Sequence, residues 1–145
     1  MRLTSVLSFV ALTLMSAAPS GSGTQEFQVV VHASVRGAWI SRTNLTAIFT
    51  RQADRWGDKA VAKPVDQSAK SPVRHAFTVS VLGRSMGEIQ QYWQNRVATD
   101  RVFPPPIMAT DEEVLRYVAA TAGAVGYVGL DTAIPEGVKV LSVTD

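Results

Sequence analysis

Two serines, a lysine and an arginine lie close together around a proline, and their types could hold an anion. They are Ser68, Lys70, Ser71 and Arg74, with Pro72 between the last two. Serine hydroxyls donate hydrogen bonds to oxyanion oxygens, a guanidinium binds them through two parallel bonds, and a lysine adds a point charge. A helix that begins at Pro72 also offers the free N–H groups and partial positive charge of its first turn. The pattern therefore predicts an anion-binding site.

Two other interpretations fit the same residues. In the first, Ser71 only caps the helix, and Lys70 and Arg74 lie in solvent. In the second, the Ser68 hydroxyl and Lys70 form a nucleophile and base, as in a hydrolase. That pair requires a desolvated and oriented lysine, which spacing alone does not supply. We therefore expect no catalytic residue here.

The composition argues against several other functions. The chain has 145 residues and no cysteine, which argues against a disulfide framework and a thiolate metal site. His32 and His75 lie far apart without acidic neighbours, so we expect no metal site. The formal charge is +2 and the basic residues form no run, which does not favour nucleic-acid binding. The sequence contains no glycine-rich nucleotide loop, so we expect no cofactor.

The predicted helices begin at capping residues that precede apolar positions at helical spacing. The helix after Pro72, a proline in the favoured first position, is expected to end at Gly83. Asp111–Glu113 are expected to stabilise the last helix through its dipole. Two starts match the capping box, with a glutamate three residues after the cap: Ser85 with Glu88 and Thr110 with Glu113. The expected capping residues are Ser41, Ser71, Ser85 and Thr110.

Short β-branched runs predict the strands. The runs are Phe27–His32, Ala124–Val128 and Val138–Val143. A strand within Val61–Val65 would lie at a sheet edge or end early, because Pro64 interrupts it. Phe103–Ile107 contains three successive prolines and predicts an extended connection. Strands that alternate with helices indicate one α/β domain over residues 27–145, with a mixed or largely parallel sheet.

Residues 1–18 have the pattern of a secretory signal peptide. Arg2 precedes the apolar run Leu3–Met15, and Ser16–Ala18 offers the small residues of a cleavage site. The run is shorter than the roughly 20 residues that a membrane-spanning helix needs. We expect cleavage after Ala18, a flexible tail at 19–26, and a periplasmic protein without a membrane span.

Three segments in order carry a family resemblance. They are SRTNLTAIFTRQADRW at 41–56, VDQSAKSPVRHAF at 65–77 and GAVGYV at 123–128. The chain resembles the phosphate-binding proteins of bacterial ABC transporters, in the type 2 periplasmic binding protein superfamily. The second segment stands where the family has its Ser-Gly-Thr phosphate segment. The resemblance spans roughly residues 27–144 and implies one three-layer lobe of the type 2 periplasmic binding protein fold.

The resemblance also implies a function. The chain would be an exported, non-enzymatic solute-binding domain for phosphate or a similar oxyanion, with an ABC permease or another periplasmic or membrane protein as its partner. Ser68 and Ser71 correspond approximately to the family's phosphate-binding positions. Ala69, Lys70 and Pro72 depart from Ser-Gly-Thr.

Two features of the resemblance favour an alternative. Family members hold phosphate between two lobes, and this chain matches only the second lobe. Thr50 also stands where the family has glycine. The domain would then keep the fold without a ligand and act as an accessory or protein-interaction module. Such a module would expose an apolar patch, at Val102–Ile107 or around Trp93.

Overall fold

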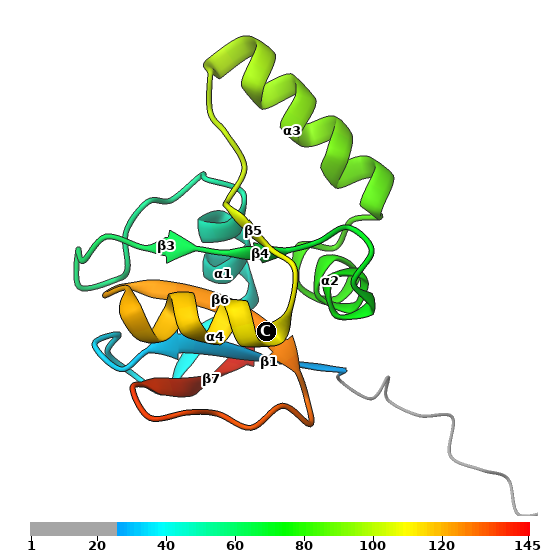
Figure 1. The fold of residues 1–145 in the computed structure, drawn as a ribbon. Helices are drawn as coiled ribbons and strands as arrows, with labels where there is room; N and C mark the ends of the chain where they lie inside the picture. Colours follow the sequence, from blue (N-terminus) through cyan, green and yellow to red (C-terminus); the bar gives the residue numbers. More distant parts are fainter. Residues whose placement is uncertain (1–25) are drawn as a thin grey trace, which may run out of the picture.

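The computed structural model describes residues 26–145, which form a three-layer α/β arrangement (Figure 1). The predicted signal peptide at 1–18 and most of the predicted tail at 19–26 lie outside the described residues. Within 26–145, every helix falls short of the length and hydropathy that crossing a membrane requires.

A five-stranded mixed sheet forms the middle layer. β1 (Phe27–His32) pairs antiparallel with β6 (Ala124–Gly129) and β7 (Val138–Thr144), whereas the two edge strands, β2 (Trp39–Ser41) and β3 (Lys63–Pro64), pair parallel with their neighbours. The edge position of β3 agrees with the prediction from Pro64, and the other predicted strands are confirmed. β2 was not predicted, because three residues are too few for an alternating pattern. In spatial order the strands are β2, β7, β1, β6 and β3.

Helices cover both faces of the sheet. The side chains of β1 alternate between these two faces, so each face carries apolar residues that a helix can bury. Val29 and Val31 pack in the core beneath α1 (Arg42–Phe49) and α2 (Pro72–Phe77), and Val30 packs in the core beneath α4 (Asp111–Ala120). Figure 1 shows α4 on one side of the sheet and α1 on the other.

Two glycines of the GAVGYV segment occupy positions that exclude a side chain. Gly123 has φ +78°, and a Cβ atom there would lie 2.1 Å from the carbonyl oxygen of Val61. A Cβ atom on Gly126 would lie 2.8 Å from methyl groups of Val65 and Val114. Gly126 therefore lets α4 pack closely on β6.

The predicted helix between Ser71 and Gly83 has two parts. α2 continues into η1 (Thr78–Leu82), a π-helical segment, and Gly83 ends the run with φ +62° as predicted. The Thr46 hydroxyl of α1 donates to the carbonyl oxygen of Val81 at 2.9 Å, which ties η1 to the core helix. π-helical turns are often found at functional sites, and this one follows the helix of the candidate site.

The second capping box differs from its prediction, and the left-handed position near Thr50 lies one residue later in the chain. Thr110 accepts from the Glu113 N–H, but the Glu113 carboxylate accepts from Ala109 at 2.8 Å rather than from Thr110, so the second capping box forms only in part. The backbone at Thr50 has φ −90°, and the left-handed residue that favours glycine is Arg51, with φ +59°.

α3 (Met86–Asp100) projects away from the three layers, and the chain returns from its end along residues 101–106 (Figure 1). The capping box of Ser85 and Glu88 is complete, as predicted. The returning segment ends in β5 (Ile107–Met108), which pairs parallel with β4 (Asp66–Gln67). β4 and β5 were not predicted, because each has only two residues. Their pairing places the end of the returning segment beside the start of the candidate site.

Candidate anion site and the groove beside α3

The turn between β4 and α2 holds the predicted site. Ser71 donates its N–H to the Ser68 carbonyl at 2.9 Å, and the Ser68 Oγ accepts from the Lys70 N–H at 3.3 Å. Ser71 caps α2, because its Oγ accepts from the Arg74 N–H, and the same hydroxyl donates to Gln67 Oε1 at 2.8 Å. The capping role of Ser71 and the first-turn position of Pro72 are confirmed.

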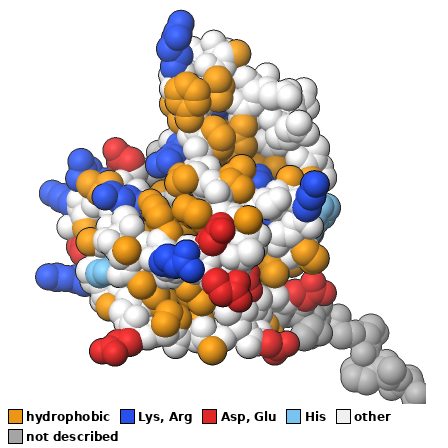
Figure 2. Space-filling model, viewed as in Figure 1, with side chains coloured by type: hydrophobic (Ala, Val, Ile, Leu, Met, Phe, Trp, Pro, Cys, Tyr) orange, Lys and Arg blue, Asp and Glu red, His pale blue; other side chains and the backbone are white. Residues whose placement is uncertain are grey.

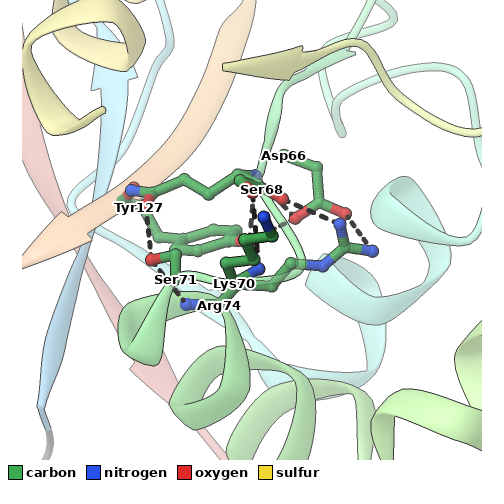
Figure 3. Close-up of polar contacts among 7 residues, drawn as sticks. Asp66, Ser68, Lys70, Ser71, Arg74 and Tyr127 are labelled. Carbon is green, nitrogen blue, oxygen red and sulfur yellow. Dashed lines mark hydrogen bonds and ion pairs between the residues drawn. The ribbon is translucent and has the colours of Figure 1, made fainter. Parts of the chain in front are cut away.

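Arg74 does not lie in solvent, as the simple capping interpretation required. Its guanidinium points toward Asp66, on the opposite side from the Ser71 hydroxyl (Figure 3). Nη2 lies 3.3 Å from Asp66 Oδ2, and Nη1 donates to the Gln67 carbonyl at 2.7 Å. Only 10% of each side chain of the ion pair is exposed. The helical spacing of apolar residues did not predict this burial, because arginine is read as a polar residue even where an ion-pair partner lets it be buried.

The Arg74 guanidinium keeps unused donor capacity. Arginine has five N–H donors, and residues 26–145 provide hydrogen-bond or ion-pair partners for Nη1 and Nη2 but none for the buried Nε. Buried donors usually have partners, and each one without a partner costs about 1–3 kcal/mol. The Nε itself is buried, but the second N–H groups of Nη1 and Nη2 can donate to a further acceptor.

Asp66 is well supplied with donors. Its Oδ1 accepts from the Tyr127 hydroxyl and from the Gln67 N–H at 2.9 Å. Burial and the adjacent Asp66 carboxylate raise the pKa of Tyr127 far above its usual range, so this phenol stays protonated. The Tyr127 ring stacks on Phe77 with centroids 4.0 Å apart, which fixes the hydroxyl within the core.

Gln67 links the turn to α4. Its Nε2 donates to Asp111 Oδ1 and to the Tyr127 carbonyl, each at 2.8 Å. Asp111 Oδ2 accepts from the Gly129 N–H at 2.9 Å and the Thr132 hydroxyl at 2.7 Å. Asp111 therefore does more than interact with the dipole of α4, which was its predicted role. No pattern in the sequence indicated these contacts of Asp111. A tyrosine in a buried strand was a signal only for Asp66, because a buried hydroxyl needs a polar partner.

An open groove with a volume of about 740 Å³ runs beside α3. We call it the α3 groove. Figure 2 shows hydrophobic side chains gathered between α3 and the segment that returns from it. The Asp66–Arg74 pair borders the groove, so the exposed tenth of Arg74 has an open neighbour. The main lining residues are Asp66, Ala69, Arg74, Ile89, Trp93, Val97, Pro104, Pro105 and Ile107.

The four predicted site residues do not converge on one hollow. Lys70 lines a second, open depression of about 980 Å³ together with Pro72, His75 and Arg42. Arg74 lines the α3 groove instead. The Ser71 hydroxyl binds Gln67, and the Ser68 hydroxyl oxygen accepts from the Lys70 backbone. The turn brings the residues close in the chain but directs the two cationic side chains to different surfaces.

Comparisons with known proteins support the fold. No family model matches the chain, and no curated protein matches it significantly. Among solved structures, an ABC-type phosphate transport receptor from Vibrio cholerae matches with a TM-score of 0.62 and 18% identity, over 81% of this chain and 46% of that one. PstS from Borrelia burgdorferi matches with a TM-score of 0.64 and 17% identity, over 83% and 47%.

A Clostridium perfringens protein solved with bound phosphate gives a similar result. Its TM-score is 0.64 and its identity 16%, over 81% of this chain and 44% of that one. The chain therefore spans less than half the length of these structures, which agrees with the expectation of a single lobe. Its fold is that of part of a phosphate ABC transporter substrate-binding protein, as the sequence resemblance predicted.

Proposed function

We propose that this protein is an exported, non-enzymatic solute-binding domain that binds phosphate or a similar oxyanion at Arg74 and the turn at 68–71. One observation carries the proposal. The Arg74 guanidinium borders the open α3 groove, and within the described residues Gln67 and Asp66 occupy only one N–H each on Nη1 and Nη2. The Ser68 hydroxyl can still donate, and Lys70 adds a charge on the other side of the turn.

The geometry favours weak binding. An oxyanion gains most when it is desolvated and bonded on all sides, and the α3 groove is open to solvent. The Asp66 carboxylate also reduces the positive potential at Arg74. Because the Ser71 hydroxyl already donates to Gln67 and Lys70 lines another depression, we expect a dissociation constant on the order of a millimolar.

Isothermal titration of the protein with phosphate and with sulfate tests the proposal. Arg74→Lys keeps the charge but removes the forked donor, and we expect it to weaken phosphate binding about tenfold, the value of one charge-assisted hydrogen bond. Lys70→Ala should weaken binding less, and Lys59→Ala, an exposed lysine away from the site, should leave it unchanged. Absence of heat and of a thermal shift at millimolar phosphate and sulfate would refute the oxyanion site.

Export and the partner are separate parts of the proposal. Mass spectrometry of the chain expressed in a bacterium with a periplasm should find a mature form that begins at Pro19. Cross-linking to an ABC permease that depends on phosphate would support a transport role. A cytoplasmic, uncleaved product would contradict export without affecting the anion site.

A second candidate function rests on exposed apolar side chains. Phe103 is 65% exposed and Ile107 is 56% exposed, both within the Val102–Ile107 stretch. Trp93, the other expected position, is buried. Such a patch suits a protein-interaction module without a ligand. This function would be favoured if Phe103→Ser abolished a periplasmic cross-link while phosphate gave no heat with either protein.

A further inference from the structure

We propose that the α3 groove selects a phosphonate or phosphate monoester that carries an apolar group, in preference to free phosphate. The inference rests on the proposed function, because it places the oxyanion at the same arginine and extends the site along α3. A site for a bare oxyanion does not explain the apolar lining of the groove, whereas a ligand with an apolar group would contact it.

The walls of the groove are apolar where a ligand at Arg74 would continue. Ile89 and Trp93 of α3 line one side, and Pro104 and Pro105 of the returning segment also line the groove. Free phosphate has no apolar surface to bury against these side chains. The groove measures about 740 Å³, within the range of about 300–1,000 Å³ that is typical of pockets for small organic ligands. Its size and lining therefore suit an organic substituent.

The charges beside the groove suit an oxyanion at one end of such a molecule. Asp66 already accepts from Tyr127, Gln67 and Arg74, so its negative charge is compensated from within the fold. Arg74 has more N–H groups than partners, which leaves it as the less satisfied member of the pair. A dianionic head group would bind the spare guanidinium donors, and its apolar group would lie toward Trp93.

Isothermal titration with phosphate, methylphosphonate, phenylphosphonate and benzyl alcohol tests this selectivity. We expect phenylphosphonate to bind about tenfold more tightly than phosphate, because burial of part of a ring is worth about one order of magnitude in affinity. Methylphosphonate should fall between them, and benzyl alcohol, which has the ring without the oxyanion, should give no measurable heat.

A matched pair of variants locates the binding. Ala98 is an exposed alanine of α3 that lines the groove, and Ala120 is an exposed alanine of α4 that does not line it. Ala98→Phe should fill part of the groove and lower the phenylphosphonate affinity several-fold while phosphate binding is unchanged. Ala120→Phe should alter neither affinity.

The possible failures are distinguishable. Absence of binding by phosphate and by both phosphonates would refute the proposed function itself. If phosphate bound as tightly as phenylphosphonate, only the selectivity would be refuted. The same conclusion would follow if benzyl alcohol bound as tightly as phenylphosphonate. Equal phenylphosphonate affinity in Ala98→Phe and the unmodified protein would overturn the location. Phosphatidic acid vesicles that bind the protein and compete with phenylphosphonate would support the ligand chemistry and identify its source as a lipid head group.

Discussion

Arg74 and Asp66 form an ion pair with Nη2 and Oδ2 3.3 Å apart, and 10% of each side chain remains exposed. A buried pair of this kind is costly to break, because removal of one partner leaves the other charge without compensation. The pair also joins α2 to β4 at the point where the α3 groove begins. It therefore contributes both to the fold and to the candidate site.

Arg74→Met should lower the free energy of unfolding by about 3–5 kcal/mol, because it leaves the Asp66 carboxylate buried without its cation. The double variant Arg74→Met with Asp66→Asn should lose less than the sum of the two single variants. Urea unfolding at neutral pH measures all three differences. The control is Arg36→Met at the exposed Arg36–Asp58 pair, for which we expect a change under about 1 kcal/mol. Strictly additive losses would contradict a coupled pair.

The stability of the protein should fall steeply at alkaline pH because of Tyr127. Its pKa is raised in the folded state, mainly by burial and then by Asp66, so the folded protein keeps a proton that the unfolded chain loses above about pH 10. The stabilisation is complete below the unfolded pKa and is lost as the pH rises above it, by about 1.4 kcal/mol per pH unit. Urea unfolding between pH 9 and pH 11, in steps, measures this slope.

Two tyrosine variants separate the contribution of Tyr127 from that of other groups. Tyr127→Phe should show a shallower slope than the unmodified protein above about pH 10, although it is less stable throughout because Asp66 loses a donor. Tyr117→Phe, which removes a half-buried hydroxyl on α4, should keep the steep slope. Identical slopes in the unmodified protein and Tyr127→Phe would show that Tyr127 ionises without hindrance in the fold.

Local signals in the sequence were sufficient for most of the fold. The caps at Ser41, Ser71 and Ser85 were predictable because each involves a side chain and a backbone N–H only three residues away. Strand β1 was predictable because its valines form a continuous apolar run.

The candidate site was less predictable, because its contacts depend on tertiary structure. The Arg74–Asp66 pair joins α2 to β4, and a two-residue strand leaves no periodic pattern that would predict it. Tyr127 lies 61 residues from Asp66 in the chain, so only the folded sheet brings the two together. The position of the turn was predictable because serines and cationic residues cluster there in the sequence. The directions of their side chains were not predictable.

Arg51→Gly should stabilise the protein by about 0.5–1 kcal/mol. Arg51 follows α1 with φ +59°, where a side chain is strained and glycine is not. The gain is smaller than the strain removed, because glycine loses more backbone entropy on folding. Thermal unfolding of Arg51→Gly and of Gln52→Gly, whose backbone is not left-handed, compares the two effects. A loss of stability in Arg51→Gly as large as that in Gln52→Gly would contradict the strain.

Gly126→Ala should destabilise the protein by about 1–3 kcal/mol, the usual cost of an extra methyl group in a packed core. The new Cβ would lie 2.8 Å from methyl groups of Val65 and Val114, so β6 and α4 would have to separate. The control is Gly57→Ala, because a Cβ there meets no atom within 4 Å.

A second variant tests whether the loss in Gly126→Ala comes from the contact with α4. Val114→Ala removes one of the two methyl groups that lie 2.8 Å from the Cβ position at residue 126, so the double variant Gly126→Ala with Val114→Ala should lose less stability than the two single variants added together. Urea unfolding of the four proteins gives this coupling. If the losses were additive, the contact with Val114 of α4 would not be the reason for glycine at position 126, and the contact with Val65 or the β6 backbone would account for it.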